Sequence, residues 1–449
     1  AVLSKVHPVR SHSLAAQGGI NAALGNHHRG ITDSAERHAF DTVKGSDYLA
    51  DQDCALAMCQ DAPEIILEME HWGCPFSRDA NGKIAQRPFG GAGFPRTCFA
   101  ADRTGHMLLH TLYEQAVRYE LGSEREQMVL YEEWFVTGLI VVDGRCYGVV
   151  AQNVLTGEFE TIIAEATVLA TGGAGRVFGN TTNALISTGY GAAMAFWAGA
   201  AIKDLEFIQF HPTSLVPTNI LMTEGCRGEG GFLMNNKGER FLGNYDDSAK
   251  AMEVAPRDIV ARNMTREIRE GRGFFNDKLG KDYLQLDLRH LGAAKIMERL
   301  PGIRDISMNF AGVDPIEEPI PVVPGQHYTM GGIHTDKDGA CPDVPGLYAA
   351  GECACVSVHG ANRLGGNSLL ETLVMGRRAG RGVAKYLDED APNAMGSKKA
   401  IEEKAEEHLA WIDGLRKAKG KESAAKINDE LQNMMPEKVG IFRDEENLK

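Results

Sequence analysis

Three segments of glycine and other small residues are the places where this chain could bind a ligand through its main chain. Residues 11–19 have the sequence SHSLAAQGG, residues 171–173 are TGG after an apolar run, and residues 350–352 are AGE after another. Glycine lets a backbone approach a bound group closely because it has no Cβ. These segments predict ligand contacts made by main-chain groups, and Glu352 adds an acid at the end of one apolar run.

The charge and the cysteine content exclude several other kinds of site. The formal net charge of −14 argues against a nucleic-acid binder, which needs a basic face. An anionic substrate would therefore need a local basic pocket. The nine cysteines are scattered and odd in number, which indicates reduced thiols in a cytosolic compartment and not a disulfide framework. Cys353 and Cys355 form a C-x-C pair with no second pair at metal-site spacing, so core thiols are favoured over a metal site, and no metal is predicted.

Eight short motifs, taken in order, resemble the flavoprotein subunits of the fumarate reductase/succinate dehydrogenase family. They extend over essentially the whole chain, and their order and spacing make the resemblance specific. The motifs are RSHS at 10–13, AQGG at 16–19, QFHPT at 209–213, TEGCRGEG at 223–230, PRD at 256–258, HYTMGG at 327–332, AGE at 350–352 and GANRLGGNSL at 360–369.

The resemblance implies an FAD cofactor that is attached covalently through a ring nitrogen of His12. The alternative is that His12 is a loop histidine that only donates or accepts a hydrogen bond. The helix that begins near Asn367 would present its N-terminus to the flavin pyrimidine, where its partial positive charge stabilises the anionic reduced flavin. The other residues that the resemblance places at the cofactor are Leu3, Ser4, Lys5, Ser11, Ser13, Ala16, Gln17, Gly18, Gly19, Trp134, Phe135, Val136, Ala170, Gly172, Gly173, His327, Tyr328, Glu352, Arg363, Ser368 and Leu369.

The resemblance also implies a clamp for a C4 dicarboxylate. Arg363 and His327 would hold one carboxylate, and the planar guanidinium of Arg363 suits a bidentate contact. His211 and Thr223 would hold the other carboxylate, while Phe89 would press on the substrate. Rotating one carboxylate out of conjugation makes the double bond more electrophilic, at the expense of binding energy elsewhere.

Hydride would pass between flavin N5 and one substrate carbon, with a proton transferred at the neighbouring carbon. The family gives the proton to the arginine matching Arg257, through residues matching Glu224 and Arg227. Arginine is normally too basic for this task, so cationic neighbours and a dry site must ease its deprotonation. In the alternative, Arg257 acts only electrostatically and His211 or water supplies the proton.

One position departs from the family pattern. Many relatives have Asp where Tyr190 stands in the segment TGYG, and a tyrosine cannot supply that charge. Tyr190 therefore suggests a divergent branch and is not assigned to the site.

The elements that must position these residues follow from the apolar spacing. Residues 1–3 resemble the end of a strand, and residues 47–72, 102–121 and 187–203 favour helices, with a loop at 89–95. Between 134 and 175, three β-branched runs separated by Asp143-Gly144 and Thr156-Gly157 predict a meander that leads into a buried strand. Residues 346–352 predict another buried strand, a helix follows from Asn367 to about Leu387, and residues 397–433 have a solvated helical pattern.

The predicted fold is α/β: a two-dinucleotide-binding, Rossmann-like FAD domain with an inserted α+β capping domain and a helical C-terminal domain. The expected ranges are 1–211 with 325–395, then 212–324 for the cap and 396–449 for the helical part. No G-x-G-x-x-G follows a strand, although a flavoprotein should have one after its first strand. We therefore expect a chain that starts at the end of the second strand of the FAD domain, without the first strand and its G-x-G-x-x-G, and that is also incomplete at its C-terminal end.

The family resemblance implies partners as well. Because the sequence has no iron–sulfur ligands, electrons would leave through an iron–sulfur subunit and a cytochrome b-type membrane anchor to a quinone pool. The protein would then sit peripherally on the cytoplasmic face of the inner membrane, with fumarate reduction slightly preferred. Two alternatives remain: an L-aspartate oxidase, which binds FAD noncovalently, and a catalytically silent assembly subunit.

Overall fold

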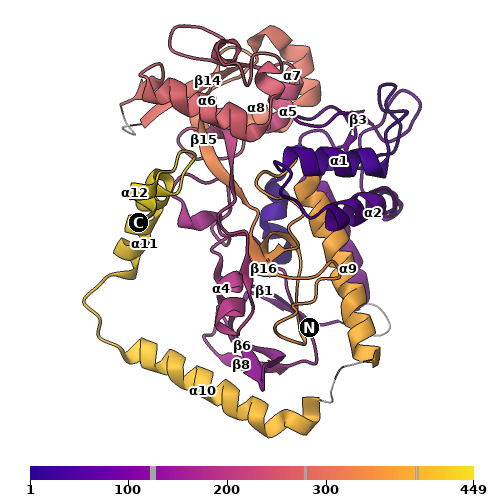
Figure 1. Cartoon of the computed structure of the whole chain (residues 1–449), viewed down its shortest axis with the longest axis vertical. Helices are drawn as coiled ribbons and strands as arrows, with labels where there is room; N and C mark the ends of the chain where they lie inside the picture. Colours follow the sequence, from indigo (N-terminus) through magenta and orange to yellow (C-terminus); the bar gives the residue numbers. More distant parts are fainter. Residues whose placement is uncertain (122–127, 278–280, 390, 392–393) are drawn as a thin grey trace.

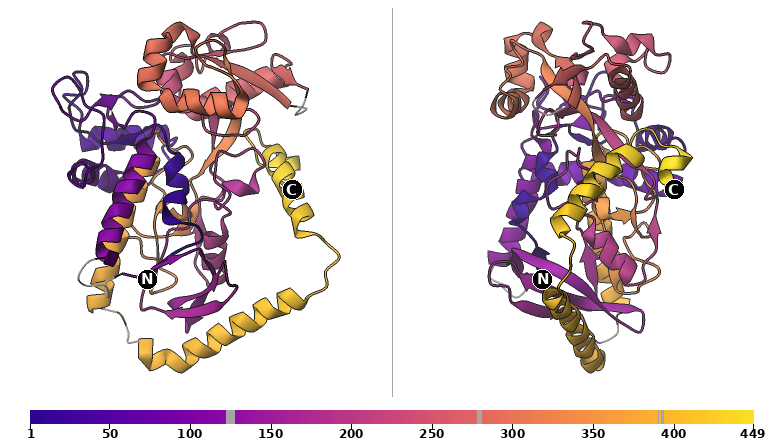
Figure 2. Two further views of the ribbon diagram at one scale, coloured as in Figure 1. Left: turned by 180° about the vertical axis from the view of Figure 1, so that it is seen from behind. Right: turned by 90° about the vertical axis from the view of Figure 1, so that its left-hand side faces the viewer.

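The computed structural model describes residues 1–121, 128–277, 281–389, 391 and 394–449. Figure 1 shows a lower body, an upper lobe that contains α5 to α8, and C-terminal helices of which α10 runs beneath the body and α11 and α12 lie at its left side. The views in Figure 2 show the same arrangement from behind and from the side. Strands β11 (Ile208–Leu215) and β15 (Ile320–Thr329) connect the lobe with the body.

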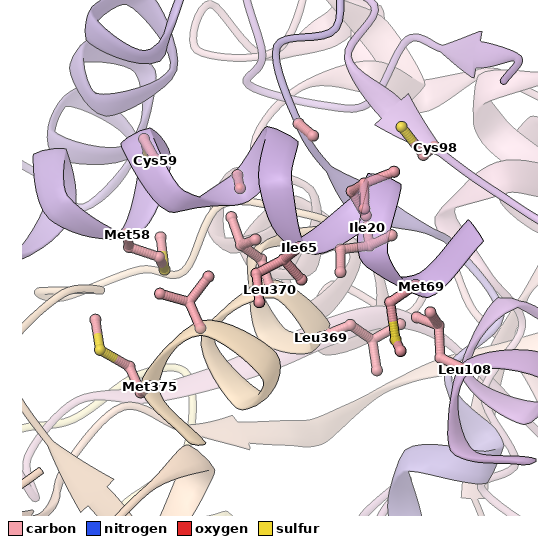
Figure 3. Close-up of a cluster of buried hydrophobic side chains, with 14 of the residues drawn as sticks. Ile20, Met58, Cys59, Ile65, Met69, Cys98, Leu108, Leu369, Leu370 and Met375 are labelled. Atoms are coloured by element: carbon pink, nitrogen blue, oxygen red, sulfur yellow. The ribbon is translucent and has the colours of Figure 1, made fainter. Parts of the chain in front are cut away.

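Four helices pack around the core of the body, which Figure 3 shows in close-up. Side chains from different helices meet there, including Met58, Ile65 and Leu370, which are all buried. Ser34 and Asp51 cap the first two helices by accepting hydrogen bonds from the main chain, as their positions favour. The helices are α1 (Ala35–Gly45), α2 (Gln52–His71), α3 (Thr104–Leu121) and α9 (Asn367–Glu389), and the last three confirm the predicted ones.

The predicted meander is present. Strands β6 (Trp134–Val142), β7 (Arg145–Asn153) and β8 (Phe159–Ile163) form an antiparallel sheet. The chain then enters β9 (Thr167–Leu169), which pairs in parallel with β17 (Leu347–Ala349). Strand β17 is buried as predicted, whereas β9 is only partly buried, because Val168 is 44% exposed. The other strands of the body are β1 (Val2–Ser4), β2 (Ile20–Asn21), β3 (Gln86–Arg87), β4 (Thr97–Cys98), β5 (Leu130–Glu132), β10 (Ile202–Lys203), β16 (Gly332–His334) and β18 (Ala354–Cys355).

The upper lobe has its own hydrophobic core, built from residues between Leu215 and Val322. Its sheet has the strand order β11-β15-β14-β12, with β13 paired to β14. The cap predicted at 212–324 would begin and end inside β11 and β15, and its boundaries remain a prediction. The lobe contains β12 (Phe232–Met234), β13 (Phe274–Asn276), β14 (Lys281–Asp287), α5 (Glu224–Gly228), α6 (Arg257–Arg269), α7 (Ala293–Arg299) and α8 (Pro301–Ala311).

Two helix predictions were wrong in their limits. The helix expected at 187–203 is only α4 (Tyr190–Trp197), because Gly189 and Gly199 on either side adopt positive φ angles of 77° and 98°. The helical segment expected at 397–433 is two helices, α10 (Lys398–Lys417) and α11 (Ala424–Lys438), followed by α12 (Glu445–Leu448). In both cases a glycine-containing stretch interrupts the apolar pattern, with Gly420 lying in the second.

The C-terminal helices contact different parts of the body. Helix α10 packs on the meander through Ile401 and Ala405, whereas α11 lies beside the turn at residues 175–177. In the described part of the chain, no helix is both long and apolar enough to cross a membrane. All nine cysteines have free thiols, and Cys353 donates to the carbonyl of Leu169 inside the core.

Candidate active site

The residues predicted to bind substrate or transfer the proton converge from six segments, and Gln209 lies among them. Gln209 and His211 lie on β11, and His327 lies opposite on β15, where His211 pairs in register with Gly325. Thr223 is the N-cap of α5, and Arg257 is the first residue of α6. The loops that carry Phe89 and Arg363 complete the site.

Glycines allow these loops to approach one another closely. A Cβ on Gly18 would lie 2.6 Å from the ring of Phe89 and 3.6 Å from Thr223 Oγ1. A Cβ on Gly365 would lie 2.7 Å from Phe89 and 3.3 Å from Arg257 Nη2. Both glycines are thus required by packing, and the upper lobe is closed against the body in this structure.

The two predicted histidines form a pair in which His211 is buried and His327 is partly buried. The rings of His211 and His327 meet edge to face with centroids 5.0 Å apart. Burial, then the positive charges of Arg257 and Arg227, lowers the pKa of His211 well below its ordinary value. Burial, followed by His211 and Arg257, does the same to the pKa of His327. Both rings are therefore neutral at physiological pH and can donate a hydrogen bond without carrying charge.

Two arginines reach the same place from the lobe and from the body. Arg257 Nε donates to Glu224 Oε2 at 2.7 Å, and its Nη1 lies 3.1 Å from Gln209 Oε1. Arg363 Nη2 donates to the same amide oxygen at 3.0 Å, and its guanidinium lies 4.4 Å from the centre of the Tyr328 ring. Burial and the charge of Arg257 lower the pKa of Arg363 to about 10, so it remains a cation.

Glu224 and Arg227 continue this cluster into the lobe. Glu224 Oε1 accepts from the amide of Gly90 at 2.6 Å. Burial alone raises the pKa of Glu224, but the charges of Arg257 and Arg227 outweigh it, so the net pKa is lowered and Glu224 is an anion. Arg227 donates to the carbonyl of Glu253, while its Nε and Nη2 are buried and have no partner among the described residues. Burial lowers the pKa of Arg227.

His12 lies in a turn of 3-10 helix, His12–Ala15, against the segment 183–184. The amide of Ala184 donates to its Nδ1 at 3.2 Å, and Asn183 Nδ2 lies 3.4 Å from its Nε2. Burial, with a smaller effect of the Arg176 charge, lowers the pKa of His12 to about 4. A neutral imidazole is the form that has a lone pair for bond formation.

The other residues predicted to contact the cofactor lie on strands of the body and in the loops that follow them. Ser4 ends β1, whose neighbour β5 leads into Trp134, Phe135 and Val136 at the start of β6. Lys5 Nζ lies 4.4 Å from the centre of the Phe135 ring. Residues 170–173 follow β9, and residues 350–352 follow the adjacent strand β17. Leu3 lies on β1, Ala170 and Gly172 follow β9, and Ser368 and Leu369 lie in the first turn of α9. In and around the 3-10 turn lie Ser11, Ser13, Ala16, Gln17 and Gly19.

These residues fit a nucleotide cofactor with hydroxyl and amide groups. Gln17 Oε1 and Arg363 Nε are buried and have no partner within the described residues. Glu352 is packed against Gly173 and accepts one hydrogen bond, from the amide of Thr329 at 2.9 Å. Burial raises the pKa of Glu352 to about 7, which a hydroxyl donor would counteract.

The side chain of Asn367 is held by hydrogen bonds within the protein. Its Oδ1 accepts from Asn21 at 2.8 Å and from His38 at 2.9 Å, and its Nδ2 donates to Thr42 at 2.9 Å. These three protein partners fix the side chain at the start of α9, and the predicted contact of Asn367 with the cofactor stays a prediction.

Tyr190 lies beside the segment predicted to meet adenine. Its hydroxyl donates to the carbonyl of Thr137 at 2.8 Å, and its ring lies 5.2 Å from that of Phe135. Burial raises the pKa of Tyr190, so the side chain is neutral where many relatives would carry a carboxylate.

Sequence reasoning missed several residues in contact with the site. Gln209 was part of a recognised motif but had no role, and Thr182 Oγ1 lies 2.8 Å from His327 Nδ1. Arg87 donates to the carbonyls of Gln17 and Gly18, which places the main chain of the cofactor loop. Of these residues, only Gln209 and Arg87 could have been recognised from the sequence, because each is a polar residue two positions before a predicted site residue, His211 and Phe89.

Comparison with known proteins agrees with this geometry. Residues 1–369 match the FAD binding domain family. The chain is 46% identical over 453 residues to the fumarate reductase flavoprotein subunit of Mycobacterium tuberculosis, covering 99% of the chain and 75% of that protein. It is equally similar, 46% over 465 residues, to the succinate dehydrogenase flavoprotein subunit of Rickettsia bellii, covering 100% of the chain and 75% of that protein.

Solved structures confirm the predicted fold class. The chain overlaps the E. coli quinol fumarate reductase with a TM-score of 0.93 at 42% identity, over 99% of this chain and 75% of that one. This chain therefore belongs to the family of fumarate reductase and succinate dehydrogenase flavoprotein subunits, enzymes with an FAD-binding domain.

Proposed function

We propose that this flavoprotein interconverts fumarate and succinate, with fumarate reduction as the preferred direction. The observation that carries the proposal is the meeting of Arg257, Arg363, His211 and His327, near which Glu224 is the acid that pairs with Arg257. Two guanidinium groups and two neutral imidazoles suit a small dianion that must be desolvated. The close overlap with a quinol fumarate reductase supports the preferred direction.

The residues of the body hold the substrate. Arg363 and His327 bind one carboxylate, and His211 and Thr223 bind the other. Arg363 Nε has no partner among the residues that the structure describes, and Nη2 is already oriented by Gln209. The guanidinium can therefore bind an anion without first being reoriented. Phe89 lies on Gly18 and Gly365 and covers the substrate, which excludes water.

Arg257 delivers the proton, with Glu224 and Arg227 as its relay. The contact of 2.7 Å between Arg257 Nε and Glu224 Oε2 allows the proton to be replaced after transfer. The cationic groups around the relay make loss of a proton easier than in water. The competing role for Arg257 is a purely electrostatic one, with the proton supplied by His211 or water.

FAD, when bound, exchanges hydride with the substrate. We propose that His12 attaches it covalently, because this imidazole is neutral and held by Ala184 and Asn183. Glu352 and Gln17 hold the cofactor through polar groups, and the start of α9 stabilises its reduced anionic form.

Electrons pass to and from partner proteins in this proposal. An iron–sulfur subunit contacts this chain, and a cytochrome b-type membrane anchor connects it to a quinone pool on the cytoplasmic face of the inner membrane. The names of the relatives as flavoprotein subunits, and of one solved structure as a quinol-fumarate reductase, support this assembly.

The test is fumarate reduction by FAD-loaded protein with an artificial electron donor. Succinate should form in proportion to donor oxidised. Oxidation of L-aspartate without fumarate turnover would instead support the aspartate oxidase alternative, and flavin that stays with the acid-unfolded chain would support attachment at His12.

A further inference from the structure

A single amide oxygen lies between the two arginines of the site. Gln209 Oε1 accepts from Arg257 Nη1 at 3.1 Å and from Arg363 Nη2 at 3.0 Å. Gln209 is 3% exposed, and Arg257 and Arg363 are 8% and 3% exposed. Two guanidinium groups this close repel each other, and the charge of Arg257 contributes to lowering the pKa of Arg363. A shared acceptor between them offsets part of that repulsion.

The orientation of this amide is fixed from its other side. Gln209 Nε2 donates to Asn362 Oδ1 at 2.8 Å and to the carbonyl of Arg363 at 2.7 Å. Both partners are acceptors, so a flipped amide would place its oxygen against two oxygens and its NH2 group against two cations. The hydrogen bonds of Nε2 therefore fix the side-chain amide of Gln209 so that Oε1 faces the two arginines.

Asn362 connects the amide to helix α6 and to α1. Its Nδ2 donates to the carbonyl of Gly45 at 3.0 Å and lies 3.3 Å from Asp258 Oδ1. Asp258 follows Arg257 in the first turn of α6. The amide pair of Gln209 and Asn362 thus contacts two successive residues of the lobe as well as the loop that carries Arg363.

We propose that Gln209 is a positioning residue that sets the separation of Arg257 and Arg363 with a neutral acceptor, so that both keep their charge for a dicarboxylate. This inference rests on the proposed function of the site. A carboxylate at the same position would hold the arginines more tightly but would neutralise one of the two charges. An apolar side chain would leave the charges and remove the spacer.

Two substitutions separate these effects. Gln209→Leu should lower kcat/KM about 30-fold, the loss expected for a hydrogen bond to a charged group. Gln209→Glu should have a KM for fumarate at least about tenfold above that of Gln209→Leu. The reason is that a negative charge roughly 10 Å from the bound dianion repels it by this much at the dielectric of a buried site. Gln209→Asn keeps a neutral acceptor on a shorter side chain and should recover part of the activity lost in Gln209→Leu. A role in packing alone would leave Gln209→Asn no more active than Gln209→Leu.

Gln86→Leu is the matched control for loss of a buried glutamine. Gln86 is 7% exposed and bonded to main-chain groups of Ala22, Asn26 and Arg96, away from the arginine pair. Gln86→Leu should lower the melting temperature but keep kcat/KM within about threefold of the wild-type value, because substrate binding does not depend on the hydrogen bonds of Gln86. All rates are measured with an artificial electron donor and divided by the amount of bound flavin, so that incomplete flavin loading is not mistaken for slow turnover.

The outcomes distinguish this inference from the proposed function. If the wild type turns over fumarate, two results overturn the positioning role. One is an equal KM in Gln209→Glu and Gln209→Leu, and the other is full activity in Gln209→Leu. An absence of fumarate turnover in flavin-loaded wild type overturns the proposed function itself. If Gln209→Glu does not fold, a Gln209→Asn variant no more active than Gln209→Leu overturns the requirement for a neutral acceptor.

Discussion

Replacing Arg257 by alanine removes the group that we propose donates the proton to the substrate. Its side chain is buried in the first turn of α6, where it is bonded to Glu224 and Gln209. If it is a general acid, kcat should fall about 10²–10⁴-fold, which is about 3–5 kcal/mol of transition-state stabilisation. Because its contribution is made in the transition state, the KM should change much less than kcat.

The same change also destabilises the folded protein, for a separate reason. Without Arg257 the carboxylate of Glu224 stays buried, with the Gly90 amide as its remaining hydrogen-bond donor. Removing one partner of a buried ion pair costs about 3–5 kcal/mol of unfolding free energy. Adding Glu224→Gln to Arg257→Ala removes the unpaired charge, so the double variant should regain stability without regaining turnover.

The assay is fumarate reduction with an artificial electron donor, expressed per bound flavin, alongside thermal unfolding of each variant. Arg257→Lys should recover a little activity because lysine retains a transferable proton with different geometry. Arg257→Ala retaining more than about a tenth of the wild-type kcat would be too active for loss of a general acid. The proton would then come from His211 or water, and Arg257 would act only as a charge.

Three further predictions concern the cofactor, the clamp and the pH dependence. His12→Ser should leave FAD bound but released by acid, and should keep some fumarate reduction while succinate oxidation is lost; flavin released by acid from the wild type would contradict attachment. Arg363→Lys should weaken dicarboxylate binding by about 2 kcal/mol, because the charge stays and the planar fork is lost, and unchanged affinity in a titration would exclude Arg363 from the clamp. The pKa of Glu352 is about 7 in the folded flavin-free chain and lower when unfolded, so the folded state holds the extra proton and loses stability as the pH rises from about 5 to 7. Glu352→Gln should remove that pH dependence in urea unfolding, and an unchanged slope would exclude Glu352 as its source.

Local patterns predicted most of the fold because each element carries its own periodicity. The meander and the strand after it were predictable because two turns, Asp143-Gly144 and Thr156-Gly157, separate runs of β-branched residues. The limits of α4 were not, since Ala and Gly in residues 187–203 favour no single end and the chain needs positive φ at Gly189 and Gly199. Helix periodicity also could not locate the break between α10 and α11.

The site was predictable from resemblance, residue by residue, but its contacts were not. Arg257 and Arg363 are over a hundred residues apart, and no local rule says that one glutamine oxygen lies between them. Asn367 shows the opposite limit: its place at a helix start was predicted, whereas its three hydrogen bonds depend on residues 21, 38 and 42, which only the fold brings near.

The two long strands that join the lobe to the body also carry His211 and His327. Because β11 and β15 continue from one core into the other as a paired ribbon, a tilt of the lobe twists this ribbon and turns both imidazoles together. Ligand affinity and lobe position are therefore linked in both directions, with equal free energy. A substitution in the lobe core, far from any ligand atom, should change dicarboxylate affinity in proportion to the change it causes in the fraction of molecules with a closed lobe.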